Sequence, residues 1–261
     1  MLLNRSTLNH VLSRIKTYKN WFTIVWPVTR IISPQRILRT RLGPKIKVRS
    51  VFGPDFVVTH EMFYRDDYNI SSIQFDCSEP VVIDVGANIG TFSLLVNCRN
   101  PRAKIFAYEP ELSNYELTEE NIRLNGVGHN IKCFSLAVAE TEGNKTFYIS
   151  TLEYAHSLEM ENIEGGDFNK KITVNTTTIE QILKSNNLDR LDLLKLDIEG
   201  TEYAVLYNLP LDLYNKIKYI ALEIHDHKTY QKEELVNFLT EKGYSVARSN
   251  KNPHVYLAKH K

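Results

Sequence analysis

Residues 81–95, VVIDVGANIGTFSLL, decide the fold. The apolar run Val81–Ile83 leads to Asp84 and then to a turn with Gly86 and Gly90, after which apolar residues recur at helical spacing. A strand, a glycine turn and a helix in this order are typical of the first unit of an α/β nucleotide-binding site. The glycines allow close approach of the backbone to a ligand, and the helix offers unpaired N–H groups at its start.

The turn differs from the fingerprint of dinucleotide-binding proteins, because Asn88 stands where that fingerprint has its middle glycine. A side chain there hinders close contact with a pyrophosphate, so a ligand without phosphates, such as S-adenosylmethionine, fits better. The next predicted strand, 103–109, ends in Glu109, where a carboxylate can bind both hydroxyls of a ribose. An ordinary crossover without a ligand is the alternative.

Three motifs occur in order: DVGANIG at 84–90, YEP at 108–110 and LKLDIEGTE at 194–202. Together they resemble the FkbM-type family of class I methyltransferases, over about residues 80–245. The resemblance implies a Rossmann-like α/β fold, with a mostly parallel seven-stranded sheet and helices on both faces. It also implies S-adenosylmethionine as the cofactor and O-methylation of sugars, polyketides or other hydroxylated metabolites.

The composition fits one methyltransferase domain at 51–261 preceded by a basic arm at 1–50. The chain has 261 residues, 43% hydrophobic and 24% charged, which is ordinary for a globular protein. Its three cysteines, Cys77, Cys98 and Cys133, form no Cys-x-x-Cys pair. They predict neither a disulfide framework nor a zinc cluster, and a cytoplasmic setting is expected.

The arm is strongly basic, with 11 Lys/Arg and no Asp or Glu in residues 1–50, whereas the rest of the chain is acidic. It is expected to be partly helical, and three hypotheses remain open for it. In the first, the arm folds as a cap against the acidic body. In the second, it contacts an anionic membrane through its cations and the apolar stretch 21–26. In the third, it serves nucleic-acid binding or targeting. The apolar stretch is too short to span a bilayer, and Pro27 interrupts it.

The periodicity predicts alternating strands and helices after residue 80. In the first part of the chain it predicts a helix at 8–23, loop-like chain at 27–45 and a hairpin of strands 45–49 and 55–59. The later strands are expected at 81–85, 103–109, 131–138, 146–149, 172–175, 191–197, 217–224, 244–247 and 254–257, and the helices at 89–97, 112–125, 179–186, 200–208 and 231–242. A polar loop at 152–169 contains His156 and Ser157, two candidates for substrate contact.

The predicted strands of the parallel sheet end in polar residues, and ligands bind at the carboxyl ends of such strands. The residues expected at the cofactor are Asp84, Gly86, Asn88, Gly90, Glu109 and Ala137, with Asp84, Gly86, Asn88 and Gly90 at its methionine end. Asp197 and His225 are expected at the reacting group, and Glu199 and Glu223 at the substrate. This convergence indicates an enzyme rather than an interaction module.

A hydroxyl acceptor must lose its proton during methyl transfer. His225 is the first candidate for the base because of its intrinsic pKa, and Asp197 is the second. Asp197, Glu199, Glu223 and His225 could together hold Mg²⁺, but a site without metal is favoured, because Glu199 and Glu202 can instead bond to the start of helix 200–208.

An oxygen acceptor is favoured because the sequence after strand 191–197 lacks the proline and aromatic residues with which base-amino methyltransferases grip a planar nitrogen. The expected acceptor is a saccharide, a glycolipid or another hydroxylated metabolite. The rival hypotheses are an RNA methyltransferase and a non-catalytic cofactor-binding protein recruited by the arm. Nucleic acid is not favoured, because the body is acidic.

Overall fold

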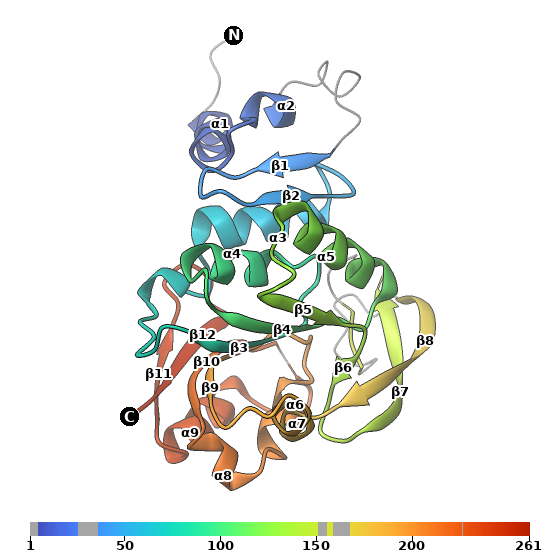
Figure 1. Cartoon of the computed structure of the whole chain (residues 1–261), viewed down its shortest axis with the longest axis vertical. Helices are drawn as coiled ribbons and strands as arrows, with labels where there is room; N and C mark the ends of the chain where they lie inside the picture. The colour runs from blue at the N-terminus through green and yellow to red at the C-terminus, as the bar shows by residue number, and fades with distance from the viewer. Residues whose placement is uncertain (1–4, 26–35, 151–155, 159–167, 226) are drawn as a thin grey trace.

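A central twisted sheet organises the computed structural model, which describes residues 5–25, 36–150, 156–158, 168–225 and 227–261. Within these ranges seven strands pair in the order β11-β12-β10-β9-β3-β4-β5, and only β12 runs antiparallel to its neighbours (Figure 1). The strands are β3 (Val81–Val85), β4 (Lys104–Tyr108), β5 (Ile131–Phe134), β9 (Leu191–Leu196), β10 (Ile217–Glu223), β11 (Tyr244–Arg248) and β12 (Val255–His260). The strand order reverses between β3 and β9, which is where a ligand crevice is expected.

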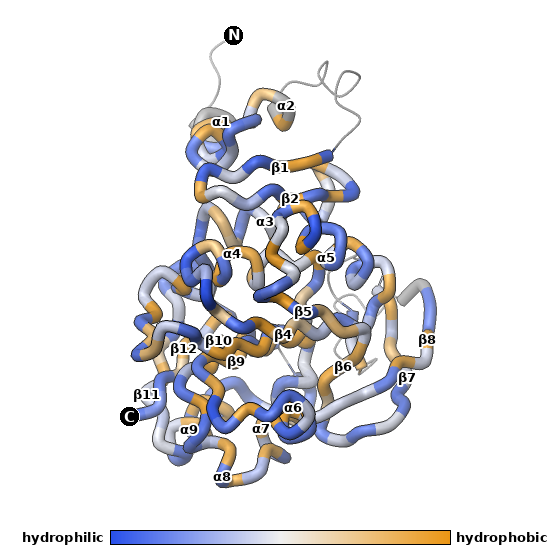
Figure 2. The backbone as a smooth tube through the Cα atoms, in the orientation of Figure 1, coloured by the Kyte–Doolittle hydropathy of each residue, from blue (hydrophilic) through white to orange (hydrophobic). Residues whose placement is uncertain are grey.

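Helices cover both faces of this sheet, as the sequence predicts. On one face lie α3 (Pro54–His60), α4 (Thr91–Arg99) and α5 (Leu112–Asn125); on the other lie α6 (Ile179–Ser185), α7 (Glu202–Tyr207), α8 (Leu211–Tyr214) and α9 (Lys232–Glu241) (Figure 1). Apolar residues are concentrated along the central strands (Figure 2). In β3, Val82 packs into the core under α4 and α5, whereas Ile83 and Val85 pack into the opposite core.

Three predictions for the chain before β3 are wrong. Residues 54–60 form helix α3 rather than a strand, since Pro54 occupies the first helical turn, where its missing N–H is not needed. The partner of β2 (Lys45–Lys47) is β1 (Ile37–Arg39), which lies in the stretch expected to be loop. The predicted helix 8–23 is divided into α1 (Arg5–Thr17) and α2 (Trp21–Val25), because Tyr18 pairs with Thr40 beside β1.

The described part of the arm packs on α5. The side chain of Asn121 accepts a hydrogen bond from the Lys47 N–H (2.6 Å), and that of Asn125 accepts one from the Lys45 N–H (2.8 Å). Leu38 and Ile46 are fully buried in the same core as α4 and α5. Within the described ranges, no helix combines the length and the apolarity that crossing a bilayer requires.

The segment between β5 and α6 forms a small second sheet at the edge of the molecule. Its strands are β6 (Ala137–Val138), β7 (Gly143–Ser150) and β8 (Phe168–Thr177), paired in the order β6-β8-β7. The two added strands predicted at 146–149 and 172–175 are therefore present, but the strand predicted at 131–138 is split between the two sheets. Of the predicted loop 152–169, residues 152–155 and 159–167 lie outside the described part of the chain.

One segment before β3, residues 57–68, reaches the carboxyl ends of the strands. After α3 the chain continues as a short π-helix (Glu61–Arg65) and then a 3-10 turn (Ile70–Ser72). Tyr68, between them, is buried and packs edge-to-face on Phe92 of α4, with ring centroids 5.7 Å apart. This segment therefore forms part of the site described next.

Candidate active site

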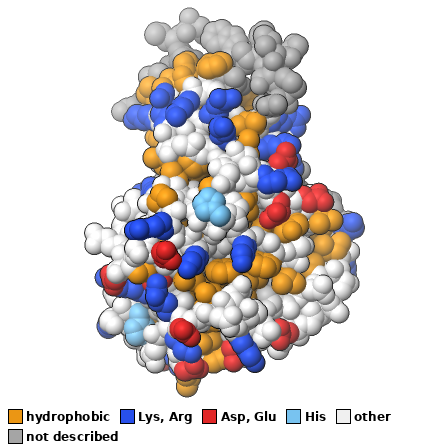
Figure 3. All heavy atoms as spheres, in the orientation of Figure 1, with side chains coloured by type: hydrophobic (Ala, Val, Ile, Leu, Met, Phe, Trp, Pro, Cys, Tyr) orange, Lys and Arg blue, Asp and Glu red, His pale blue; other side chains and the backbone are white. Residues whose placement is uncertain are grey.

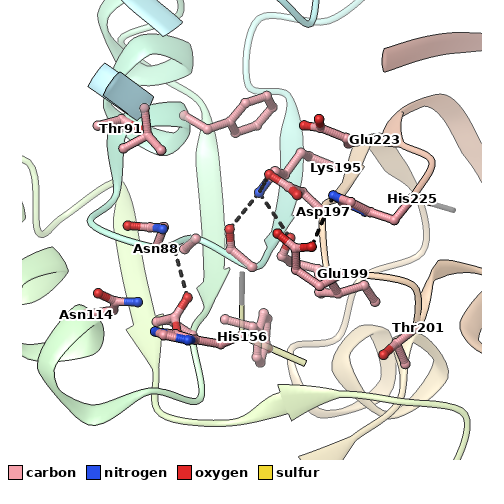
Figure 4. Close-up of a pocket in the computed structure, with 18 of the residues that line it drawn as sticks. Asn88, Thr91, Asn114, His156, Lys195, Asp197, Glu199, Thr201, Glu223 and His225 are labelled. Carbon is pink, nitrogen blue, oxygen red and sulfur yellow. Dashed lines mark hydrogen bonds and ion pairs between the residues drawn. The ribbon is translucent and has the colours of Figure 1, made fainter. Parts of the chain in front are cut away.

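A cavity of about 350 Å³ lies at the carboxyl ends of β3, β4, β9 and β10. Its walls come from the turns after these strands, from the segment 57–68 and from β7 with the adjoining residue His156. Figure 4 shows the polar side chains of these turns gathered around it. The cavity is thus at the edge of the sheet where the sequence predicts it.

The glycine turn after β3 is closely packed against the turn after β9. Gly86 has a φ of +76°, and a Cβ there would lie 1.9 Å from the backbone oxygen of Asp197. Only glycine fits this contact. Asn88 also has a left-handed backbone, with a φ of +51°, and it lines the cavity together with Gly86.

Glu109 faces the cavity from the end of β4. Its two carboxylate oxygens accept hydrogen bonds from the backbone N–H groups of Asn88 (2.8 Å) and Glu111 (2.9 Å). Burial raises the pKa of Glu109 to about 7, although these two N–H groups act in the opposite direction. Each oxygen keeps a lone pair for a ligand hydroxyl.

Asp84 and Gly90 lie beneath the wall of the cavity rather than on it. The Asp84 side chain is fully buried and accepts a hydrogen bond from the Ser93 hydroxyl (2.7 Å). Gly90, with a φ of +82°, begins α4 and packs against Thr118. These two residues therefore support the turn, whereas Ala137, from the edge sheet, does line the cavity.

Lys195, to which sequence reasoning gave no role, connects the two halves of the site. Its ammonium nitrogen Nζ donates to the backbone oxygen of Gly86 (2.6 Å) and lies 3.3 Å from Asp84 and 3.5 Å from Asp197. Burial disfavours its charge, but Asp197 and Asp84 outweigh burial and raise the pKa of Lys195. The sequence does contain a signal for this role, because a single lysine stands near the end of a buried apolar strand. A charged side chain in such a place needs a partner of opposite charge.

Tyr68 joins two of the predicted carboxylates. Its hydroxyl lies 2.9 Å from Oδ2 of Asp197 and 3.2 Å from Oε2 of Glu223. Burial opposes ionisation of Asp197, but Lys195 and His225 outweigh it and lower the pKa of Asp197. Burial and the Asp197 charge raise the pKa of Glu223 to about 7. Asp197 is therefore the group of this pair that holds a negative charge at neutral pH.

His225 lies between two carboxylates. Its Nδ1 is 3.0 Å from Oε1 of Glu202, and its Nε2 is 3.4 Å from Oε2 of Glu199. Burial favours the neutral ring, but Glu202 and Glu199 outweigh it and raise the pKa of His225 well above its ordinary value. A protonated imidazole has no lone pair with which to accept a proton, so this arrangement favours Asp197 over His225 as the base.

Glu202 is a second residue that sequence reasoning placed only at a helix start. It is fully buried, and its carboxylate accepts hydrogen bonds from the backbone N–H groups of Ile198 (2.9 Å) and Gly200 (2.8 Å). It thereby holds the turn in which Glu199 takes a left-handed backbone, with a φ of +53°. Burial and the neighbouring carboxylates raise the pKa of Glu199 to about 8, against the attraction of His225.

His156 and Ser157 are placed differently from each other. His156 lines the cavity, and its Nδ1 accepts the N–H of Ser150 (3.1 Å). Ser157 is fully buried and donates its hydroxyl to the backbone oxygen of Glu199 (2.8 Å). Ser157 therefore attaches the edge sheet to the site, and only His156 is in a position to contact a ligand.

Of the four residues considered for Mg²⁺, only three lie close enough together to share an ion. Asp197, Glu223 and His225 offer ligand atoms that all lie within 4.8 Å of one another. However, Asp197 and Glu223 already accept from Tyr68, Asp197 lies beside Lys195, and His225 lies between two carboxylates. These contacts are the reason why a site without a metal ion stays the favoured hypothesis.

The strand order, with β12 antiparallel, and the glycine turn facing a carboxylate at the end of β4 define a class I methyltransferase. The chain belongs to the FkbM methyltransferase family, because the profile of the methyltransferase FkbM domain matches residues 84–246. It is therefore an S-adenosylmethionine-dependent methyltransferase.

Curated relatives share about a quarter of the sequence. Methyltransferase sdnD from Sordaria araneosa is 26% identical over 214 residues, which cover 72% of this chain and 81% of the relative. Hexuronic acid methyltransferase AglP from Haloferax volcanii is 26% identical over 148 residues, or 56% of each chain. The 2-O-methyltransferase NoeI from Sinorhizobium fredii is 22% identical over 165 residues, which cover 59% of this chain and 66% of the relative.

A solved structure supports the fold. The human methyltransferase 10 domain containing protein superposes with a TM-score of 0.52 over 100% of this chain and 99% of its own, at 12% identity. At this level of identity the likeness extends to the fold alone.

The residues around the cavity fit S-adenosylmethionine. Oδ1 of Asn88 and Oγ1 of Thr201 are buried at the cavity without a hydrogen-bond partner among the described residues, and such atoms require a partner. Glu109 offers acceptors for the ribose hydroxyls. The carboxylate of Asp197, whose pKa is lowered, lines the same cavity, and its negative charge suits a sulfonium cation.

Proposed function

We propose that this enzyme transfers a methyl group from S-adenosylmethionine to a hydroxyl group of a saccharide, a glycolipid or another hydroxylated metabolite. The observation that carries this proposal is the position of Asp197, which lines the cavity with Oδ2 held between the ammonium of Lys195 and the hydroxyl of Tyr68. A carboxylate kept charged in a buried site can accept the proton of an acceptor hydroxyl. A positioned base contributes a factor of ~10²–10⁴ to such reactions.

Each side of the cavity has its own task in this proposal. Glu109 and the turn with Gly86 and Asn88 bind and orient the cofactor, which supplies a methyl group activated by a positive sulfur. Asp197 accepts the proton of the hydroxyl, and Glu223 and Glu199 orient the acceptor through hydrogen bonds. Because methyl transfer needs the acceptor oxygen in line with the reacting carbon, this positioning accounts for most of the catalysis.

An oxygen acceptor is supported by the turn after β9. Residues 197–200, DIEG, offer no aromatic ring on which a planar base could stack. The names of two relatives fit this view, one being a 2-O-methyltransferase and the other a hexuronic acid methyltransferase.

A nucleic-acid acceptor is disfavoured by the charge of the cavity. Glu61, Asp67, Glu199 and Glu223 all line it. Burial and neighbouring carboxylates raise the pKa of Glu61 to about 7, so this group is only partly ionised at neutral pH. Asp197, which also lines the cavity and whose pKa is lowered, keeps its negative charge. A phosphate backbone next to these groups would be repelled.

The test is methyl transfer to a panel of hydroxylated, carboxylated and aminated acceptors and to RNA, with the product located by mass spectrometry. We expect O-methylated products, and a loss of about 10²–10⁴ in kcat for Asp197→Asn with cofactor affinity nearly unchanged. Activity is expected to survive exhaustive chelation. Methylation of nitrogen or RNA, or full activity of Asp197→Asn, would overturn the proposal.

A further inference from the structure

Three cations of the N-terminal arm lie side by side on β1, on β2 and on the segment after α1 that pairs with the end of β1. Tyr18 pairs antiparallel with Thr40, and the Lys19 N–H donates to the backbone oxygen of Arg39 (2.7 Å), so Lys19 lies opposite Arg39. Arg39 in turn lies opposite Lys45 in the β1-β2 register. Residues opposite each other project from the same face, and all three are exposed. They form a row across the sheet, which we call the cationic row.

No carboxylate among the described residues pairs with a side chain of the cationic row, and the sequence places no Asp or Glu in residues 1–50. Lys47 of the same hairpin shows the contrast, because it pairs with Glu120 of α5 at 2.5 Å. Like charges directly opposite each other destabilise a sheet. Binding of an anionic partner would therefore relieve the repulsion between the three cations of the cationic row.

Exposed apolar side chains lie among the cations of the arm. Leu42, at the turn between β1 and β2 and next to Arg41, is 49% exposed. Phe22 of α2 is 51% exposed. Leu12 is 42% exposed and lies one helical turn before Lys16 on α1, so the two share a face. Figure 3 shows Lys and Arg side chains gathered over this part of the molecule, with hydrophobic ones between them.

The combination of exposed cations and exposed apolar side chains distinguishes between two kinds of anionic partner. A nucleic acid offers phosphates to the cations but leaves Leu12, Phe22 and Leu42 in water. An anionic bilayer offers headgroup phosphates to the cations and an apolar layer to the leucine and phenylalanine side chains. We propose that the arm binds the surface of an anionic membrane through the cationic row, with Leu42 and Phe22 entering the headgroup region.

This binding is independent of the methyl acceptor, because none of these residues lines the cavity. Its test uses the full chain and sedimentation with vesicles of phosphatidylcholine alone or mixed with phosphatidylglycerol. We expect binding to the mixed vesicles only, weakening as salt is added.

The decisive variant is Lys19→Gln/Arg39→Gln/Lys45→Gln. Since each basic residue near an anionic surface contributes about fivefold in affinity, the triple variant is expected to lose about a hundredfold. The matched control is Lys132→Gln/Lys170→Gln/Lys184→Gln, which makes the same change in net charge at exposed positions elsewhere and should bind as the parent does. Circular dichroism checks that both fold.

Leu42→Ser separates the bilayer from other anions. It should weaken binding to the mixed vesicles while leaving the salt dependence unchanged, because it removes apolar area and no charge. Equal binding to both kinds of vesicle, or equal loss in both triple variants, would overturn the proposal. So would tight binding of an RNA duplex that the cationic-row variant loses and Leu42→Ser keeps.

Discussion

The carboxylate of Glu202 lies 3.0 Å from Nδ1 of His225, and it also receives the backbone N–H groups of Ile198 and Gly200. One buried side chain thus fixes both the imidazole and the turn that carries Glu199. The two sides of the acceptor site, from β9 and from β10, are held together by this residue.

Replacing Glu202 with Gln should separate these effects. The amide keeps the volume but loses the charge that stabilises the imidazolium, so the pKa of His225 should fall toward its ordinary value. A backbone N–H left without an acceptor should also cost about 1–3 kcal/mol of stability. The pH dependence of kcat and the NMR titration of the His225 ring measure the first effect. An unchanged titration, with only lower stability, would mean that Glu202 acts on the fold alone.

Glu109→Ala tests the cofactor pocket. If Glu109 binds the ribose hydroxyls as proposed, the variant loses their acceptors and should bind S-adenosylmethionine at least about tenfold more weakly, since hydrogen bonds to a charged group contribute about 1.5–3 kcal/mol. Calorimetric titration measures this, with Glu111→Ala as the control, because it changes a carboxylate that does not line the cavity. Equal affinity of Glu109→Ala and the parent would count against the pocket assignment.

Lys195→Met removes a cation that is only 3% exposed. Because it leaves Asp84 and Asp197 without their partner, we expect a loss of about 3–5 kcal/mol in the free energy of unfolding. Urea denaturation measures it. The double variant Lys195→Met/Asp84→Asn should recover part of the loss, whereas two additive losses would show that the ion pair is not the cause.

The unliganded protein should become less stable as the pH rises from about 5 to about 8. Burial and the neighbouring carboxylates raise the pKa of Glu199 to about 8, and burial and the Asp197 charge raise the pKa of Glu223 to about 7. The folded state therefore binds more protons than the unfolded state in this range. The raised pKa of His225 acts in the same direction, because its contribution is full below the unfolded pKa and lost as the pH rises through the folded one.

Thermal unfolding without cofactor across this range measures the slope, and Glu199→Gln should flatten it, since the amide does not titrate. A slope that is the same in parent and variant, or that rises with pH, would exclude Glu199 as its source.

The sequence predicts the central sheet and its ligand edge because both depend on local patterns. Apolar runs, the glycine turn of 84–90 and the polar residues after each strand all lie within short segments. The hairpin predicted at 45–59 failed because a run such as Phe56–Val58 fits a strand or a buried helix equally well. The hairpin of β1 and β2 packs on α5, some 80 residues away, and no local pattern indicates this contact.

The residues of the site likewise divide into those that a local pattern indicates and those that depend on distant contacts. Asp197, Glu223 and His225 could be found because each lies at the end of a predicted strand or directly after it. Tyr68 lies 129 residues before Asp197 in the chain, and no local pattern indicates that its hydroxyl reaches the far strands. For Lys195 and Glu202 the residue types were visible, but their roles depend on burial, which the sequence does not display directly.

The position of Tyr68 places part of the cavity wall before the residues that the family profile matches. The family profile begins at residue 84, yet Glu61, Asp67 and Tyr68 already form one wall of the cavity. A fragment cut at the family boundary would keep every signature motif, but its cavity would be open to bulk water on one side. Sequence searches that trim relatives to the shared profile would therefore discard the residues that form this wall of the cavity.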